Sequence, residues 1–240
     1  MKIKHRKILI LLIVAVLLFA AGFAYLSDYY RADNDALAVF AAYSAVHPKE
    51  LSDGIVAFIP ENALSGLVFY PGGKVEYTAY EPLMQACAER GILCVLLEMP
   101  FNLAVFDVNA ADGIQEFFPG IENWYIGGHS LGGSMAAAYL ADNTAAYDGL
   151  ILLGSYSTAD LSLSGIDALS VYGSEDGVLN REKYKDNIPN LPEEYKEIII
   201  QGGNHAGFGV YGEQNGDGEA FISNEEQICI AADSIAEFMK

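Results

Sequence analysis

Short apolar runs alternate with helix-like periods along most of this 240-residue chain, and this alternation constrains the fold more than any other feature. Residues 92–97 read ILCVLL, a continuous apolar stretch expected of a strand buried on both faces. The other strand-like runs are residues 55–59, 66–70, 124–126, 149–153, 169–172 and 197–201. Such alternation predicts an α/β fold, in which helices cover both faces of a mostly parallel sheet.

Helical periods fill several of the gaps between these runs. Apolar residues with helical spacing follow residue 78, where Thr78 and Glu81 have the spacing of a capping box, and Gly91 ends the pattern. Ser223 and Glu226 repeat that spacing before the last apolar period. A short helix is expected over residues 112–118.

One turn in the chain has the sequence of a nucleophile elbow. Gly128, Ser130 and Gly132 form a G-x-S-x-G pattern between the run at 124–126 and an alanine-rich helical period. A serine on such a tight strand-to-helix turn needs neighbours without a Cβ, which is why glycines flank it. The pattern is short enough to arise by chance in a glycine-rich chain, so its meaning depends on other residues.

A nucleophilic serine needs a base, and the chain has four histidines to supply it. His5 precedes a long apolar run, His47 precedes the first strand, and His129 adjoins Ser130, where neighbouring side chains diverge. His205 remains, in a loop just beyond the strand-like run at 197–201. The alternative is a loop histidine with structural hydrogen bonds only.

The histidine needs a carboxylate to orient it. Asp176 lies in a turn after the run at 169–172, and Glu175 is the competing candidate. Either could instead be an ordinary exposed acid. The order Ser130, acid, His205 along the chain is the order expected of a triad on this kind of sheet.

The oxyanion formed during acyl transfer needs backbone N–H donors. Leu131, directly after the serine, is expected to supply one. Gly73 or Lys74, in the Pro-Gly-Gly-Lys loop after the run at 66–70, is expected to supply the other. An ordinary Pro-Gly turn is the alternative for that loop.

The stretches YPGGKV, GGHSLGG, YGSEDGV and GGNHAGFG resemble those of α/β-hydrolases, in the compact group that includes dienelactone-hydrolase-like and carboxylesterase-like bacterial proteins. The resemblance covers residues 51–240 and implies acyl transfer through a Ser130–His205–Asp176 triad. Dienelactone hydrolases use a cysteine nucleophile where this chain has serine. Residues 154–168 are too few for a cap domain, and Tyr156 and residues 101–106 are expected to form the pocket rim.

The N-terminal segment has the composition of a membrane anchor. Residues 8–26 carry no charge, follow the basic sequence KIKHRK, and are about as long as the roughly 20 residues that cross a bilayer. Residues 1–26 are therefore expected to form an uncleaved signal anchor with the catalytic domain, residues 51–240, outside the cytoplasm. The alternative is secretion after cleavage. Residues 27–50 are expected to form a linker with one helix, capped by Asp33 or Asn34.

Charge and cysteine content restrict the partners. Four of 13 basic residues precede the apolar run, which leaves nine basic and 32 acidic residues and a formal charge of −23 for the rest. So acidic a body repels nucleic acid and anionic lipids. Cys87, Cys94 and Cys229 have no metal-binding spacing and are expected to be free core thiols. The acidic, glycine-rich residues 207–219 do not match a calcium loop and are expected to be an exposed loop.

The sequence thus predicts a serine hydrolase that cleaves small to medium, uncharged carboxylic esters without a metal or organic cofactor. Two alternatives remain open at this point. An acyltransferase would use the same triad with an alcohol in place of water, and a binding module would keep the fold without catalysis.

Overall fold

The computed structural model describes residues 2–240. The first residue of the predicted 1–26 segment lies outside the described residues. The side chains of Lys2, Lys4 and Arg6, on which the predicted orientation of that segment partly depends, also lie outside them.

An eight-stranded sheet forms the centre of the body, with the strand order β1-β2-β4-β3-β5-β6-β7-β8. The first two strands pair in antiparallel fashion with their neighbours, and all the others are parallel. The strands are β1 (Pro48–Ser52), β2 (Ile55–Phe58), β3 (Ser65–Tyr70), β4 (Ile92–Leu97), β5 (Asn123–His129), β6 (Gly149–Leu153), β7 (Asp167–Gly173) and β8 (Lys196–Ile200).

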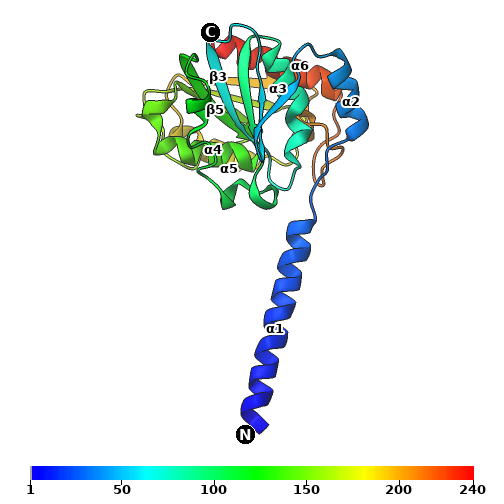
Figure 1. Cartoon of the computed structure of the whole chain (residues 1–240). Coiled ribbons are helices and arrows are strands. Elements are labelled where there is room, and N and C mark those ends of the chain that lie inside the picture. Colours follow the sequence, from blue (N-terminus) through cyan, green and yellow to red (C-terminus); the bar gives the residue numbers. More distant parts are fainter. Residues whose placement is uncertain (1) are drawn as a thin grey trace.

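Helices cover both faces of this sheet, which confirms the predicted α/β fold (Figure 1). α3 and α6 pack together on one face, and α4 packs on the other. β4 is buried along its whole length, as its continuous apolar sequence predicts. The α-helices are α1 (Lys2–Ser27), α2 (Asn34–Tyr43), α3 (Glu81–Ala88), α4 (Leu131–Ala141), α5 (Arg181–Asn187) and α6 (Asn224–Phe238). The 3-10 helices are η1 (Tyr77–Tyr80), η2 (Pro100–Asn102), η3 (Ala104–Phe106), η4 (Ile114–Phe117), η5 (Thr144–Ala146), η6 (Ile188–Asn190) and η7 (Ala206–Phe208).

Several local predictions differ from the structure. The capping box at Thr78 is wrong, because residues 77–80 form η1 and α3 begins at Glu81 without a side-chain cap. The cap at Ser223 is confirmed, since its Oγ accepts the Glu226 N–H at 3.1 Å. The predicted helix over 112–118 is only the 3-10 turn η4.

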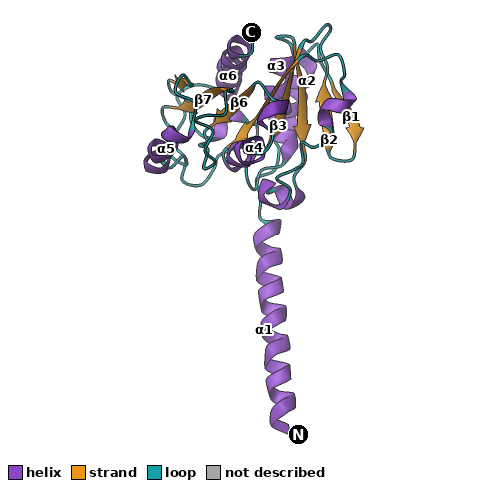
Figure 2. Cartoon of the chain, turned by 90° about the vertical axis from the view of Figure 1, so that its left-hand side faces the viewer, coloured by secondary structure: helices purple, strands orange, loops and turns teal. Residues whose placement is uncertain are grey.

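α1 extends away from the body in both views (Figures 1 and 2). Its segment Lys7–Ser27 is long and apolar enough to cross a membrane, and none of it is buried against the body. A helix of this kind is compatible with a membrane anchor or with a signal sequence.

α1 leaves the body at the C-terminal ends of the parallel strands. Just after α1, Tyr30 forms a β-bridge with Val75 and its N–H donates to the carbonyl of Lys74 at 2.7 Å, in the loop that follows β3. At the N-terminal ends of these strands, the ring of Phe238 in α6 lies 5.7 Å from that of Tyr125, near the start of β5. The C-terminus accordingly lies on the side of the body away from α1 (Figures 1 and 2).

The segment after α1 packs on the body. The Asp33 carboxylate caps α2 by accepting the N–H groups of Asp35 and Ala36, and Leu37 and Phe40 pack against the core. The sheet begins at Pro48, three residues before the predicted start of the catalytic domain.

The cysteines are free, as predicted, but only two of them belong to the core. Cys87 and Cys94 are buried, whereas Cys229 is exposed on α6, so its predicted core position is wrong. Periodicity alone gives the spacing of a face and does not show whether a neighbour covers each position on it.

Candidate active site

Ser130 lies on a strained turn between β5 and α4. Its φ is +52° and its ψ −122°, a region that costs a residue with a Cβ about 1–3 kcal/mol. The surroundings hold this conformation through both backbone groups of Ser130. Its N–H donates to the Leu153 carbonyl at 2.9 Å, and its carbonyl accepts from the Ser155 Oγ at 2.6 Å.

The two glycines of the elbow are required by close backbone contacts. A Cβ on Gly128 would lie 2.5 Å from the Tyr70 carbonyl oxygen. A Cβ on Gly132 would overlap the carbonyl oxygens of Tyr70 and Pro71. The elbow therefore lies directly against the end of β3, and α4 starts with its N-terminus at Ser130.

His205 and Asp176 form a buried pair beside this turn. The His205 Nδ1 lies 2.8 Å from the Asp176 Oδ2, and both side chains are fully buried. The other carboxylate oxygen of Asp176 accepts the N–H groups of Val178 at 3.0 Å and Leu179 at 2.8 Å, which fixes the carboxylate plane. The competing Glu175 instead accepts a hydrogen bond from the Ser174 hydroxyl.

Ser130 and His205 line the same pocket, a cavity of about 230 Å³. Among the described residues, the His205 Nε2 is buried without a hydrogen-bond partner, and no hydrogen bond joins it to the Ser130 hydroxyl. Gly154, at the end of β6, also lines the cavity, and a Cβ there would lie 2.9 Å from the His205 Nδ1. The missing side chain leaves the space that the imidazole occupies.

The predicted rim is only partly present. Tyr156 lines the cavity together with Leu131 from α4 and Leu179 from the loop after β7. Residues 101–106 are not among the residues that line it.

Two backbone N–H groups without a hydrogen-bond partner among the described residues, those of Leu131 and Gly73, belong to neighbouring elements. Leu131 is the first residue of α4, so its N–H has no partner within the helix, and the helix N-terminus favours negative charge. The Lys74 N–H donates to the Asn102 carbonyl at 2.7 Å, whereas no hydrogen bond of the Gly73 N–H exists among the described residues. A Cβ on Gly73 would lie 2.8 Å from the Leu131 side chain, so the two loops are in contact.

His129 is a second buried histidine, next to the His205–Asp176 pair. Its Nδ1 lies 2.7 Å from the Tyr80 hydroxyl, and its ring centroid is 4.4 Å from that of His205. The Tyr80 hydroxyl also accepts the Gly72 N–H at 3.2 Å. Burial and the neighbouring His205 hold the pKa of His129 well below its usual value, so His129 is neutral and Tyr80 donates to it.

This neutral histidine should make stability depend on pH. Because the pKa of His129 is lower in the folded than in the unfolded chain, its contribution is fully present above pH about 6.5 and is lost as the pH falls below that value. Between pH about 7.5 and 5.5, wild type should therefore lose more unfolding free energy than His129→Gln, by an amount on the order of 1 kcal/mol. Urea unfolding followed by the single tryptophan, Trp124, measures this difference.

His47→Gln is the matched control, since His47 is exposed. It should keep the pH dependence of wild type. Parallel curves for wild type and His129→Gln would show that His129 is protonated equally in the folded and unfolded states.

Asp217 connects the loops that carry Asp176 and His205. Its Oδ1 accepts the N–H groups of His205 at 3.1 Å and Gly177 at 3.0 Å, and its Oδ2 accepts the Ala206 N–H at 2.8 Å. Residues 207–219 were expected to be an exposed loop, but Phe208, Val210 and Tyr211 are buried. Asp217 departs from this prediction as well, by accepting backbone hydrogen bonds from both sides of the pair. The signal in the sequence was only an acid among glycines, which does not reveal the long-range partners.

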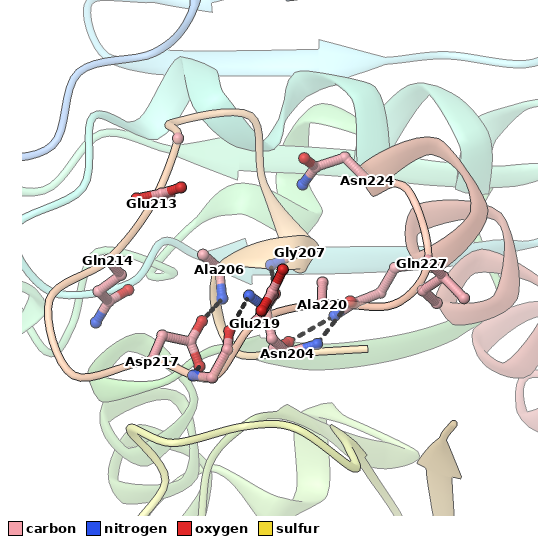
Figure 3. Close-up of a pocket in the computed structure, with 13 residues that line it drawn as sticks. Asn204, Ala206, Gly207, Glu213, Gln214, Asp217, Glu219, Ala220, Asn224 and Gln227 are labelled. Carbon is pink, nitrogen blue, oxygen red and sulfur yellow. Dashed lines mark hydrogen bonds between the residues drawn. The ribbon is translucent and has the colours of Figure 1, made fainter. Parts of the chain in front are cut away.

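A larger cavity, of about 560 Å³, lies on the other side of the His205 loop. Figure 3 shows Asp217 bonded to the Ala206 N–H at its edge and Gln227 bonded to Asn204 beyond it. Glu213 and Glu219 also line this cavity, but neither Ser130 nor the His205 ring does. Among the described residues, no group of three acidic, histidine or cysteine side chains is placed to hold a metal ion.

Replacing Asp217 with Asn should displace the His205–Asp176 pair without changing any residue that lines the cavity with Ser130. The amide cannot accept at both ends, so the Ala206 N–H or the Gly177 and His205 N–H groups lose their acceptor. Because a shift of about 1 Å in a reacting group can cost about 10²-fold in rate, we expect kcat to fall by about that factor with little change in KM. Steady-state kinetics on a soluble ester tests this.

Glu219→Gln removes a charge from the same loop at an exposed residue that makes no hydrogen bond through its side chain among the described residues. It should leave kcat unchanged. Equal kcat values for Asp217→Asn and wild type, with both folded, would contradict the positioning role.

The comparisons with known proteins agree with the observed fold. A sequence model of the alpha/beta hydrolase family matches residues 66–229. Among proteins with curated descriptions, none matches this sequence.

Several solved structures share the fold at low identity. A dienelactone hydrolase from Anabaena variabilis is 14% identical, with a TM-score of 0.58 over 82% of this chain and 99% of that one. Est1E from Butyrivibrio proteoclasticus is 14% identical, with a TM-score of 0.57 over 82% and 98%. A thermostable esterase from Pseudomonas putida is 12% identical, with a TM-score of 0.60 over 86% and 89%.

Proposed function

Since the chain belongs to the alpha/beta hydrolase family, we propose that it is a serine hydrolase that cleaves carboxylic esters through Ser130, His205 and Asp176. The observation that carries this proposal is the free Nε2 of the buried His205, which lines the same pocket as the strained Ser130. His129 also has a buried Nε2 without a partner among the described residues, but His129 does not line this pocket and its Nδ1 meets a tyrosine hydroxyl, whereas the Nδ1 of His205 meets the Asp176 carboxylate.

The pair fixes the proton positions needed for catalysis. Because the carboxylate of Asp176 can only accept, the Nδ1 of His205 carries the proton and Nε2 is the basic atom. Nε2 removes the proton of the Ser130 hydroxyl as the oxygen attacks the ester carbonyl carbon. It then returns that proton to the departing alcohol, which leaves an acyl group on Ser130.

Water completes the cycle by the same route. His205 takes a proton from water as the water oxygen attacks the acyl carbon, and the Ser130 oxygen leaves with that proton. The carboxylic acid is released and the free enzyme is restored.

The negative charge of each tetrahedral intermediate needs two amide donors. The Leu131 N–H supplies one, at the N-terminus of α4. The Gly73 N–H supplies the other, because Lys74 already donates to Asn102 and Gly73 lies against Leu131.

The pocket favours uncharged esters. No Lys, Arg, Asp or Glu side chain is among the described residues that line it. Its volume of about 230 Å³ is below the roughly 300–1,000 Å³ of pockets that enclose a whole drug-sized ligand. It therefore accommodates the ester group and a short acyl chain.

The long apolar N-terminal helix supports a location of this activity at a membrane. Residues 7–27 act as a single-pass anchor, and the preceding basic residues keep the N-terminus in the cytoplasm, with the catalytic body outside.

Labelling with a fluorophosphonate probe tests the proposed chemistry. The probe should label wild type at Ser130 and should not label Ser130→Ala. Ser134→Ala is the matched control, since Ser134 lines the same pocket but donates to the Tyr156 carbonyl, and labelling should persist. A folded wild-type protein that resists the probe would be a binding module and not a serine hydrolase.

A further inference from the structure

α1 leaves the body at the C-terminal ends of the parallel strands, and the proposed active site lies at the same ends. β3, β5, β6 and β7 are parallel, and Ser130, Gly154 and Asp176 follow the last three of them at their carboxyl ends. Tyr30, three residues beyond α1, pairs with Val75 just after β3. If α1 is embedded in a bilayer, the C-terminal ends of these strands are the part of the body that faces the bilayer (Figure 2).

The end of α1 is tied to the loop that contains Gly73. The Lys74 ammonium group lies 4.4 Å from the centroid of the Tyr25 ring in α1 and 3.1 Å from the Asp28 carboxylate. The Lys74 backbone binds Tyr30 through its carbonyl and Asn102 through its N–H. Tyr25, Tyr29 and Tyr30 also give this end of the helix the aromatic residues that are common at the level of lipid headgroups.

An apolar loop projects beside this end of α1. α1 contacts η2, and η2 is followed directly by η3. Phe101 is 60% exposed and Phe106 56% exposed, and their rings meet edge to face at 5.7 Å with the exposed Val105 next to them. We call Phe101, Val105 and Phe106 the aromatic loop. Isolated exposed apolar residues are ordinary, but a cluster at the end of a membrane-type helix is not.

The aromatic loop adjoins the pocket through packed residues. Leu103, between its members, is buried, and a Cβ on Gly73 would lie 3.5 Å from Leu103 and 2.8 Å from Leu131. Leu131 follows Ser130 and lines the pocket. Leu103, Gly73 and Leu131 thus connect the aromatic loop to Ser130 through direct contacts.

We infer that the aromatic loop inserts into the leaflet beside α1 and that the active site takes acyl esters dissolved in that leaflet. This inference rests on the proposed function, because it names the source and class of the substrate. The exposed Asp107 directly after Phe106 keeps the loop at the depth of the headgroups. The acidic body repels anionic lipids, so the headgroups that fit are zwitterionic or uncharged.

The small pocket agrees with such a substrate. A cavity of about 230 Å³ holds the ester group and the nearest part of the chain, and the rest of a long acyl chain remains in the leaflet along the aromatic loop. A soluble ester needs none of these outer contacts.

The first test measures insertion and does not depend on catalysis. The full chain with Cys229→Ser, which removes the exposed native thiol, is placed in phosphatidylcholine vesicles, and an environment-sensitive fluorophore is attached at Val105→Cys or Leu64→Cys. Leu64 is 59% exposed and directly precedes β3, so it lies at the N-terminal ends of the parallel strands, away from α1. Emission from position 105 should shift to shorter wavelength and be quenched by nitroxide lipids, while position 64 should behave as in water. Water-like emission at both positions would overturn the inference.

The second test compares two substrates in the same vesicles, a long-chain ester dissolved in the bilayer and a water-soluble acetate ester. Phe101→Asp/Phe106→Asp should hydrolyse the bilayer ester about tenfold more slowly than wild type and the soluble ester at the same rate. Leu64→Asp should match wild type on both.

The outcomes separate the two proposals. Equal loss on both esters, or no loss on the bilayer ester, would overturn the inference and leave the hydrolase standing. If wild type cleaves neither ester, the proposed function fails, and the fluorophore result still decides whether the loop meets the membrane.

Discussion

Asp176→Asn should lower kcat for ester hydrolysis by about 10⁴-fold with little change in KM. The amide oxygen can still accept the N–H groups of Val178 and Leu179, so the turn keeps its shape. The amide nitrogen would then face the His205 Nδ1 and donate to it. Nε2 would carry the proton instead and could not act as the base for Ser130. Steady-state kinetics on a soluble ester measures the loss.

Glu175→Gln is the matched control because it changes the neighbouring acid by the same chemistry. Among the described residues, the Glu175 carboxylate accepts a hydrogen bond only from Ser174, and Glu175 does not line the pocket, so its substitution should leave kcat unchanged. A large loss in Glu175→Gln with near-normal kcat in Asp176→Asn would reverse the assignment of the acid.

Gly132→Ala should lower the free energy of unfolding by about 3 kcal/mol or more. The added Cβ would overlap the carbonyl oxygens of Tyr70 and Pro71, which belong to backbone and cannot rotate away. Relief requires α4 to move from the end of β3, which would also displace Ser130. Urea unfolding of the full chain in detergent, followed by Trp124 fluorescence, measures the change.

Gly120→Ala provides the comparison. A Cβ on Gly120 meets nothing within 4 Å, so the free energy of unfolding should change by less than about 0.5 kcal/mol. Similar stability for Gly132→Ala and wild type would mean that the elbow tolerates a side chain and that the tight turn is not needed.

Patterns of neighbouring residues predicted much of the fold. Each buried parallel strand appears as an apolar run, because both faces of such a strand are covered. β1 is missing from the predictions because its residues 48–52 are mostly exposed and include one partly buried leucine, and α5 because its sequence REKYKDN has no apolar stripe. Both elements owe their place to neighbours that local patterning does not reveal.

The candidate site divides in the same way. The elbow could be recognised because its geometry restricts three nearby positions, Gly128, Ser130 and Gly132, and the order of acid and histidine along the chain pointed to Asp176 and His205. Asp217 and the Tyr80–His129 pair were missed. Each acts through groups far away in sequence, such as the Gly177 N–H for Asp217 or the His205 ring for His129.

The sequence by itself predicted seven of the eight strands, the tight turn at Ser130 and the residues proposed to do acyl-transfer chemistry, because these depend on side-chain periodicity and on glycine at a few neighbouring positions. Only the tertiary structure decided which acid meets His205, that the Lys74 N–H is already used, and that the proposed active site lies at the strand ends where α1 leaves the body. These depend on where separate loops end in space, and loop ends are set by the packing of the whole sheet.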